Sequence, residues 1–176
     1  MDIYFLRHAS AGQASQAGND EKRPIDKTGE QQSREVARAL AALEVKLDVI
    51  ISSPLTRAVQ TAKITAAELD HKDEIVTDGA LRPEASYKQF EHLLARFGKN
   101  KAIMVVGHNP SMTDFLNQML AGSDSAEFID FKKGAVAKVE KDGSEAAVLK
   151  WYMTPKLVRA IQGASASNSR PKTVSK

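Results

Sequence analysis

Three short apolar runs stand out along the chain, and each is followed by a polar turn. They predict strands at residues 2–7, 48–52 and 102–106. An apolar run of this length that is bounded by turn residues is typical of a buried strand.

Between these runs, apolar residues recur every three or four positions, which indicates amphipathic helices. The first helix has Asp26 as its predicted N-cap. Its inward face would consist of Val36, Leu40, Leu43 and Leu47. The remaining helices are predicted from Thr56, around residues 87–97, from Pro110, and from Thr154 to about Ile161.

The end of the chain changes character. Residues 135–140 and 145–153 flank Lys141-Asp142-Gly143, which predicts a β-hairpin. Strands that alternate with helices favour a mostly parallel sheet, here with an antiparallel addition late in the chain. We therefore expect a three-layer α/β/α sandwich with a mostly parallel twisted sheet, built as a single domain over residues 1–162.

Composition excludes several classes of protein. The 176 residues are 42% hydrophobic and 27% charged, as in ordinary globular domains. The chain contains no cysteine, which rules out disulfides and thiolate chemistry. No apolar stretch approaches the roughly 20 residues that span a bilayer, and no signal-peptide pattern opens the chain. The expected location is the cytoplasm, without membrane association.

The net charge of +3 raises the question of a nucleic-acid partner. Residues 163–176 carry Arg170, Lys172 and Lys176 and no acidic residue, so this segment accounts for the whole excess. The predicted domain before it is neutral on balance. We expect the segment to be a disordered basic tail, and we expect no nucleic-acid binding.

Cationic and ionisable residues follow the predicted strands. Arg7 and His8 end the first strand, Arg57 lies just beyond the second, and His108 follows the third. Ligands of open α/β sheets bind beyond the carboxyl ends of the strands. Guanidinium groups bind phosphoryl oxygens in a bidentate manner, and an imidazole beside them stays neutral and nucleophilic because like charge disfavours its cation. The pattern predicts a phosphoryl-transfer site.

Ordered motifs along residues 1–161 resemble the histidine phosphatase superfamily, which includes the phosphoglycerate mutases. The resemblance is strongest to its small-domain branch of bacterial phosphohistidine phosphatases, the SixA type. The motifs are Leu6-Arg7-His8-Ala9, Arg23-Pro24 with Thr28-Gly29, Ser52-Ser53-Pro54-Leu55-Thr56-Arg57-Ala58 with Gln60-Thr61-Ala62, Val106-Gly107-His108-Asn109-Pro110, and Trp151 with Pro155 and Leu157.

The resemblance implies a phosphoglycerate mutase-like fold and a role for each site residue. His8 would be the nucleophile that accepts the phosphoryl group, and water would later hydrolyse the phosphohistidine. Arg7 and Arg57 would clamp the phosphoryl oxygens, and His108 would donate a hydrogen bond to the transferring group. The resemblance implies no metal and no organic cofactor.

Two positions depart from the superfamily pattern. The usual glycine after the nucleophile is Ala9 here, which still supplies a carbonyl to hold the imidazole N–H. Larger members carry an acidic residue as general acid, and Glu84 is the candidate in this chain. An acid helps most when the leaving group is poor, whereas an imidazole protonates near neutral pH. Because Glu84 is the single candidate for a general acid, the sequence favours phosphohistidine over sugar phosphates as the substrate.

The expected function is removal of phosphate from the phosphohistidine of a signalling protein by a monomeric enzyme. One alternative is a phosphatase with the same pocket that acts on a small phosphorylated metabolite. Another, of a different class, is a non-catalytic module that binds phosphate or phosphoproteins, which would not need the nucleophile. A nucleotide-binding domain is disfavoured because no G-x-G-x-x-G follows the first strand.

Overall fold

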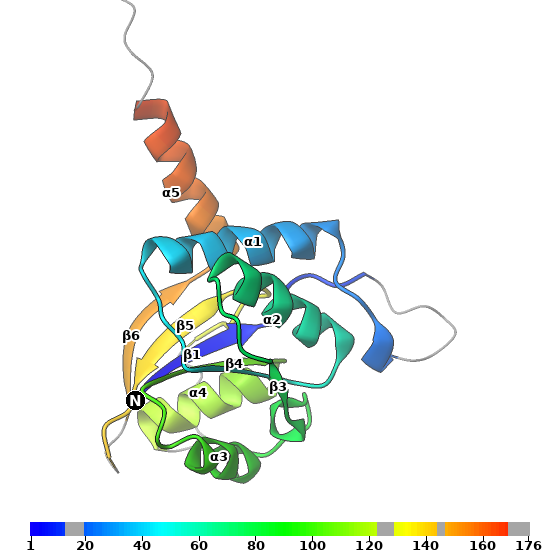
Figure 1. The fold of residues 1–176 in the computed structure, drawn as a ribbon, viewed down its shortest axis with the longest axis vertical. Helices are drawn as coiled ribbons and strands as arrows, with labels where there is room; N and C mark the ends of the chain where they lie inside the picture. Colours follow the sequence, from blue (N-terminus) through cyan, green and yellow to red (C-terminus); the bar gives the residue numbers. More distant parts are fainter. Residues whose placement is uncertain (13–19, 123–128, 144–146, 169–176) are drawn as a thin grey trace, which may run out of the picture.

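A six-stranded sheet forms the centre of the molecule in the computed structural model, which describes residues 1–12, 20–122, 129–143 and 147–168. Its strands lie in the order β3-β2-β4-β1-β5-β6 (Figure 1). Their bounds are β1 Asp2–Arg7, β2 Val49–Ser52, β3 Val76–Thr77, β4 Ala102–Gly107, β5 Val136–Glu140 and β6 Val148–Met153.

The sheet is mixed, so the prediction of a mostly parallel sheet is corrected. Strand β4 pairs in parallel with β1 and β2, and β2 pairs in parallel with β3. Strands β5 and β6 form the predicted hairpin, and β5 pairs antiparallel with β1. A hairpin turn reverses the chain, so its two strands must run in opposite directions. The hairpin accounts for the β5–β6 pair, and the long-range pairing of β5 with β1 adds the second antiparallel pair.

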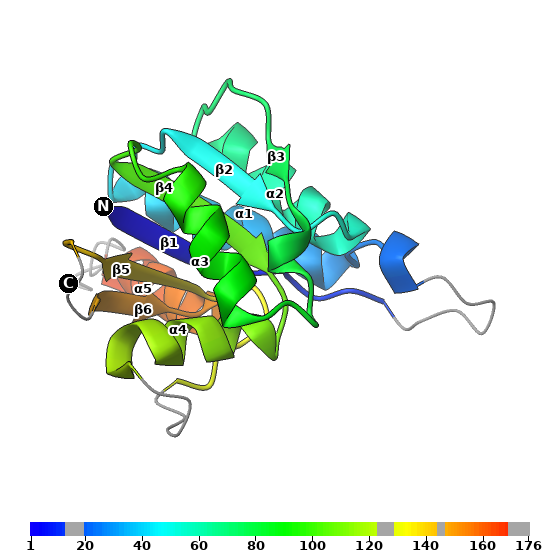
Figure 2. The same ribbon diagram turned by 90° about the horizontal axis from the view of Figure 1, so that it is seen from below.

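Helices cover both faces of the sheet (Figures 1 and 2). Helices α1 and α2 lie on one face, and α3 and α4 lie on the other, so the chain has three layers. Two short 3-10 turns, η1 and η2, complete the described elements. The bounds are η1 Asp20–Lys22, α1 Lys27–Ala42, α2 Thr56–Glu68, η2 Gly79–Leu81, α3 Tyr87–Arg96, α4 Ser111–Ala121 and α5 Pro155–Asn168.

Helix α1 begins as predicted and ends earlier than predicted. The Asp26 side chain accepts a hydrogen bond from the Gly29 N–H at 2.7 Å, which caps the helix. The predicted inward residues Val36 and Leu40 are buried. Leu43 is instead 56% exposed, because the helix stops at Ala42 and the chain turns away there. The fourth predicted residue, Leu47, lies beyond the helix and is partly buried.

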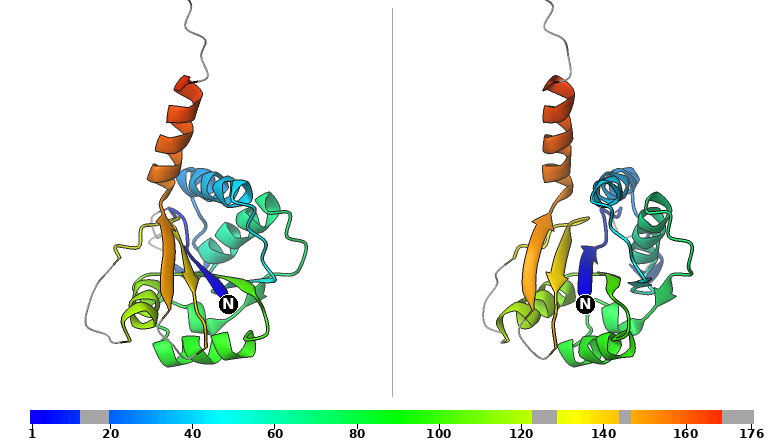
Figure 3. Two further views of the ribbon diagram at one scale, coloured as in Figure 1. Left: turned by 90° about the vertical axis from the view of Figure 1, so that its left-hand side faces the viewer. Right: turned by 60° about the vertical axis from the view of Figure 1, so that its left-hand side comes forward.

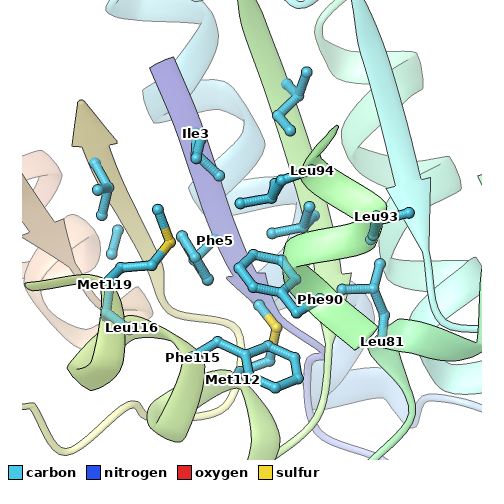
Figure 4. Close-up of a cluster of buried hydrophobic side chains, with 14 of the residues drawn as sticks. Ile3, Phe5, Leu81, Phe90, Leu93, Leu94, Met112, Phe115, Leu116 and Met119 are labelled. Atoms are coloured by element: carbon cyan, nitrogen blue, oxygen red, sulfur yellow. The ribbon is translucent and has the colours of Figure 1, made fainter. Parts of the chain in front are cut away.

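The sheet separates two hydrophobic clusters. Figure 4 shows the cluster beneath α3 and α4, where Phe90 and Phe115 stack at 4.5 Å between ring centroids and Phe5 of β1 packs against Phe90. The second cluster lies under α1 and α2 and includes Leu6 and Val106. Alternate residues of β1 thus enter opposite cores, which fixes its register.

Helix α5 packs its first turns beside α1 and then extends away from the body (Figure 3). Val158 is buried, and Arg159 forms an ion pair with Glu35 of α1 at 2.7 Å. The helix runs to Asn168, beyond the predicted end near Ile161. Residues 163–168 of the predicted tail are therefore helical, and residues 169–176 lie outside the described residues. Within the described chain, no helix is long and apolar enough to cross a membrane.

Candidate active site

Three adjacent strands end at one edge of the sheet. Strands β2, β4 and β1 are neighbours and parallel, so their carboxyl ends meet there (Figure 2). His8 follows β1 and His108 follows β4, while Arg57 lies in the first turn of the helix after β2. The two imidazole rings lie 4.9 Å apart between centroids. The structure therefore brings residues far apart in the sequence into one cluster.

His8 is held as a specific tautomer. Its side chain is 6% exposed, and Nδ1 lies 2.7 Å from the carbonyl oxygen of Ala9. A carbonyl oxygen can only accept, so Nδ1 must carry the proton and donate it. In the neutral ring, Nε2 then carries the lone pair. The alanine carbonyl thus makes the contact that we expected of it.

The pKa of His8 is lowered to about 4. Burial is the largest cause, because it disfavours the charged imidazolium. The hydrogen bond to Ala9 opposes this shift, and the positive charges of Arg57 and Arg7 add to it. Like charge alone, which the sequence suggested as the reason for a neutral histidine, is therefore the smaller contribution.

This shift predicts the protonation state of His8 over the whole neutral range. Below pH about 4 the ring gains a proton and loses its lone pair, so a reaction that needs the lone pair slows as the pH falls through 4 rather than through about 6.5. We expect the ring resonances of His8 to titrate with a midpoint near pH 4 in an NMR titration of the free protein. The denatured protein, where burial is lost, serves as the control, and a folded-state midpoint at or above 6 contradicts the prediction.

Arg57 is oriented by the 3-10 turn η1. Its side chain is almost fully buried, Nη1 donates to the backbone oxygen of Asp20 at 2.8 Å, and Nη2 pairs with the Asp20 carboxylate at 3.0 Å. Asp20 also pairs with Arg23 at 2.9 Å, and Arg23 donates to the carbonyl oxygen of Gly12 at 3.1 Å. Arg23 therefore ties the loop after β1 to the cluster, and Asp20 links the two arginines.

Arg7 is anchored by the segment before β5. Its Nη1 donates to the carbonyl oxygen of Phe131 at 2.6 Å, and Asn109 donates to the same oxygen at 3.2 Å. The Gly134 N–H lies 3.2 Å from the carbonyl oxygens of both Arg7 and His8. The strand end that carries the cluster is therefore held from both sides, by β4 and by the approach to β5.

His108 is the most buried member of the cluster, at 1% exposure. Its Nε2 lies 2.8 Å from the hydroxyl of Ser53, which follows β2. Burial lowers the pKa of His108 to about 2, with further contributions from His8, Arg57 and Arg7. The preceding glycine allows the close approach of α4, because a Cβ on Gly107 would lie 2.7 Å from the Met112 sulfur.

Three buried nitrogens of this cluster lack a hydrogen-bond partner among the described residues. They are Nε of Arg7, Nε of Arg57 and Nδ1 of His108. Buried polar groups are normally paired, so three unpaired nitrogens gathered in one cluster are consistent with a ligand as their partner. Two guanidinium N–H donors beside two imidazoles suit an oxyanion such as a phosphoryl group.

Glu84 does not join the cluster. Its side chain is 68% exposed and lies 3.8 Å from Arg82, which pairs with Glu21 at 2.6 Å. No hydrogen bond or ion pair connects Glu84 to the two arginines and two histidines. Among the described residues, no group of three or more histidine and acidic side chains has the geometry to hold a metal ion.

Three residues support the cluster although the sequence assigned them no role, and two of them, Ser53 and Thr61, lie in the quoted motifs. Asp20 holds Arg57, and Ser53 contacts His108. Thr61 bridges α2 and the loop after β1, because its hydroxyl donates to the Arg57 carbonyl at 2.8 Å and accepts from the Ala9 N–H at 3.2 Å. The Thr61 contact to its own helix has the ordinary spacing of four residues, whereas the other contacts are long-range. Local sequence patterns do not predict these long-range contacts.

Two arginines and two histidines gather at the strand ends of an α/β/α fold, around buried nitrogens without a hydrogen-bond partner among the described residues, and this cluster is the candidate active site. The family model of the histidine phosphatase superfamily, branch 1, matches residues 3–96, and the chain belongs to this superfamily. It is accordingly an enzyme of the histidine-nucleophile phosphatase class.

The chain is similar to known proteins over most of its length. It is 30% identical to an uncharacterised protein of Picosynechococcus sp. over 77% of this chain and 82% of that protein. It is 25% identical to the phosphohistidine phosphatase SixA of Escherichia coli K12, over 92% of this chain and all of that protein. A solved structure of SixA with tungstate superimposes with a TM-score of 0.79 at 23% identity, covering 89% and 98% of the two chains.

Proposed function

We propose that this phosphatase removes the phosphoryl group from phosphohistidine on a protein, by way of a phosphorylated His8. The observation that carries the proposal is the lone pair on Nε2 of a buried, neutral His8, next to three unpaired N–H or imidazole nitrogens. This arrangement places a nucleophile beside groups that stabilise negative charge on the phosphoryl oxygens.

The proposed reaction has two steps. In the first, Nε2 of His8 attacks phosphorus, the bond from phosphorus to the substrate imidazole breaks, and the departing ring nitrogen takes up a proton from solvent. In the second, water attacks phosphorus on His8, which releases orthophosphate and the free imidazole. Arg7 and Arg57 bind the phosphoryl oxygens in both steps, and His108 donates a hydrogen bond to them.

The leaving group decides the substrate class. An alkoxide leaving group needs a nearby acid, whereas an imidazole nitrogen protonates near neutral pH. Glu84, the candidate acid, is exposed and engaged with Arg82 rather than with the cluster. The similarity to a protein named phosphohistidine phosphatase supports the same choice. Both observations favour a phosphoramidate over a phosphate ester.

Glu84→Gln tests whether an acid is needed. We expect this variant to hydrolyse phosphohistidine with kcat/KM within about 3-fold of wild type, because an exposed ion pair contributes little and the leaving group needs no protein acid. The measurement is steady-state release of phosphate from a phosphohistidine-bearing domain. A loss as large as that of His8→Ala would show that Glu84 acts as the general acid.

A substrate comparison tests the proposed function. The full chain is given a phosphohistidine-bearing domain, a set of sugar phosphates and the phosphoglycerates, and phosphate release is measured for each. The His8→Ala variant controls for contaminating phosphatases. Preferred turnover of phosphohistidine that disappears in the variant is the expected result. Preference for a small metabolite contradicts the substrate class, and binding of phosphoprotein without turnover contradicts the proposed activity.

A further inference from the structure

The two histidines of the cluster are held by different kinds of partner. The Nδ1 atom of His8 meets a carbonyl oxygen, which can only accept. His108 instead meets the hydroxyl of Ser53, which can donate or accept. The tautomer of His108 is therefore not fixed by the identity of its partner alone, and it depends on what else the hydroxyl contacts.

The hydroxyl of Ser53 is fully buried, so its single proton needs an acceptor within the protein. Its side chain is 0% exposed, and its oxygen lies 3.4 Å from the N–H of Leu55, which can only donate. Among the described residues, Nε2 of His108 at 2.8 Å is the acceptor within its reach. If Nε2 carried the proton, the hydroxyl would accept from two donors, and its own buried proton would have no partner.

We infer that Ser53 donates its hydroxyl proton to Nε2 of His108 and so holds the proton of this ring on Nδ1. Ser53 is then a positioning residue for His108. Nδ1 has no hydrogen-bond partner among the described residues, so in this tautomer its proton is left for a hydrogen bond to the substrate.

The direction of this hydrogen bond decides what His108 offers to a phosphoryl group. With the proton on Nδ1, the ring donates to a phosphoryl oxygen. With the proton on Nε2, it presents a lone pair that repels the same oxygen. The tautomer matters because the buried ring is neutral, and a doubly protonated ring would donate from both nitrogens. By selecting the tautomer protonated on Nδ1, the serine hydroxyl makes His108 a hydrogen-bond donor toward the phosphoryl group.

The inference rests on the proposed function for its catalytic consequence, and it has a readout that does not need substrate. Long-range proton–nitrogen NMR of the free protein reports which ring nitrogen of His108 carries the proton. We expect Nδ1 in the wild type and a shift of the population toward Nε2 in Ser53→Ala. A wild-type ring protonated on Nε2 overturns the inference, whether or not the protein hydrolyses phosphohistidine.

The kinetic experiment compares two neighbouring serines. We expect Ser53→Ala to lose on the order of 10–100-fold in kcat, since one donor to the transferring group is lost in part. Ser53→Thr keeps the hydroxyl and should restore most of the activity and the Nδ1 tautomer. Ser52→Ala is the matched control, because that serine is equally buried but its hydroxyl donates to the Ser53 carbonyl, whereas the hydroxyl of Ser53 bonds to His108.

Two outcomes of this comparison overturn the role of Ser53. One is a Ser53→Ala variant with unchanged tautomer and unchanged kcat. The other is an equal loss in Ser52→Ala without any tautomer change, which shows that the strand end is disturbed generally. If Ser53→Ala fails to fold, the wild-type spectrum and the Ser53→Thr variant still decide the question.

Discussion

Replacing His8 with alanine reduces the hydrolysis of phosphohistidine by about 10⁴-fold or more, because the alanine side chain has no atom that can accept the phosphoryl group. The arginines and His108 remain, so the variant still binds phosphate. Two measurements check this: steady-state release of phosphate, and a test of whether enzyme that has received a labelled phosphoryl group from substrate loses it in acid. Wild type should carry an acid-labile phosphoryl group during turnover, and the variant should carry none.

His92→Ala is the matched control for this result. His92 lies on helix α3, is exposed and forms no part of the cluster, so the same substitution there should leave kcat and the phosphoenzyme unchanged. A His8→Ala variant that keeps a tenth of the wild-type rate would mean that the nucleophile is another group. A labelled phosphoryl group at a different residue would lead to the same conclusion.

Replacing Arg57 with alanine is expected to have the second-largest effect, a loss of about 10²–10³-fold in kcat/KM. Its guanidinium is nearly fully buried and held by Asp20, so its orientation is set before substrate arrives. In the proposed mechanism its Nε, which has no hydrogen-bond partner among the described residues, donates to the phosphoryl group. Arg57→Lys should recover only a small part of the activity, because an ammonium cannot match the planar fork.

Orthophosphate provides a second readout for the same variant. Calorimetric titration should show binding to wild type and strongly weakened binding to Arg57→Ala. The matched control is Arg38→Ala, which removes an exposed arginine that is paired with Glu68 on the helical surface. Equal phosphate affinity in wild type and Arg57→Ala would remove Arg57 from the phosphate-binding site.

Much of the fold follows from local sequence patterns. The three apolar runs become β1, β2 and β4, and each predicted helix forms. The two-residue strand β3 is too short to produce a pattern. The pairing of the hairpin with β1 is also long-range, and it changes the sheet from mostly parallel to mixed. The ends of the helices were predicted least accurately, as the exposed Leu43 shows.

The gathering of the two histidines and two arginines could be anticipated because parallel strands end at one edge of a sheet. The residues that hold them could not. Asp20 reaches Arg57 across 37 positions of sequence, and Ser53 reaches His108 across 55. Such pairs depend on how the loops fold back over the strand ends, and neither propensity nor periodicity encodes that. Burial, the main cause of the lowered pKa of His8, is likewise a property of the packed molecule.

The adjacency of β2, β4 and β1 has a consequence for how this architecture can diversify. Neighbouring strands lie about 4.8 Å apart, so three consecutive strand ends span roughly 10 Å, which is enough for one phosphoryl group and the ring that receives it. In the proposed mechanism, the sheet thus sets the spacing of the two histidines. Apart from the segment that carries Asp20 and orients Arg57, the connecting segments beyond these strand ends can change in length and sequence without altering that spacing. Selection for a new substrate can therefore act on the loops while the reaction itself is conserved.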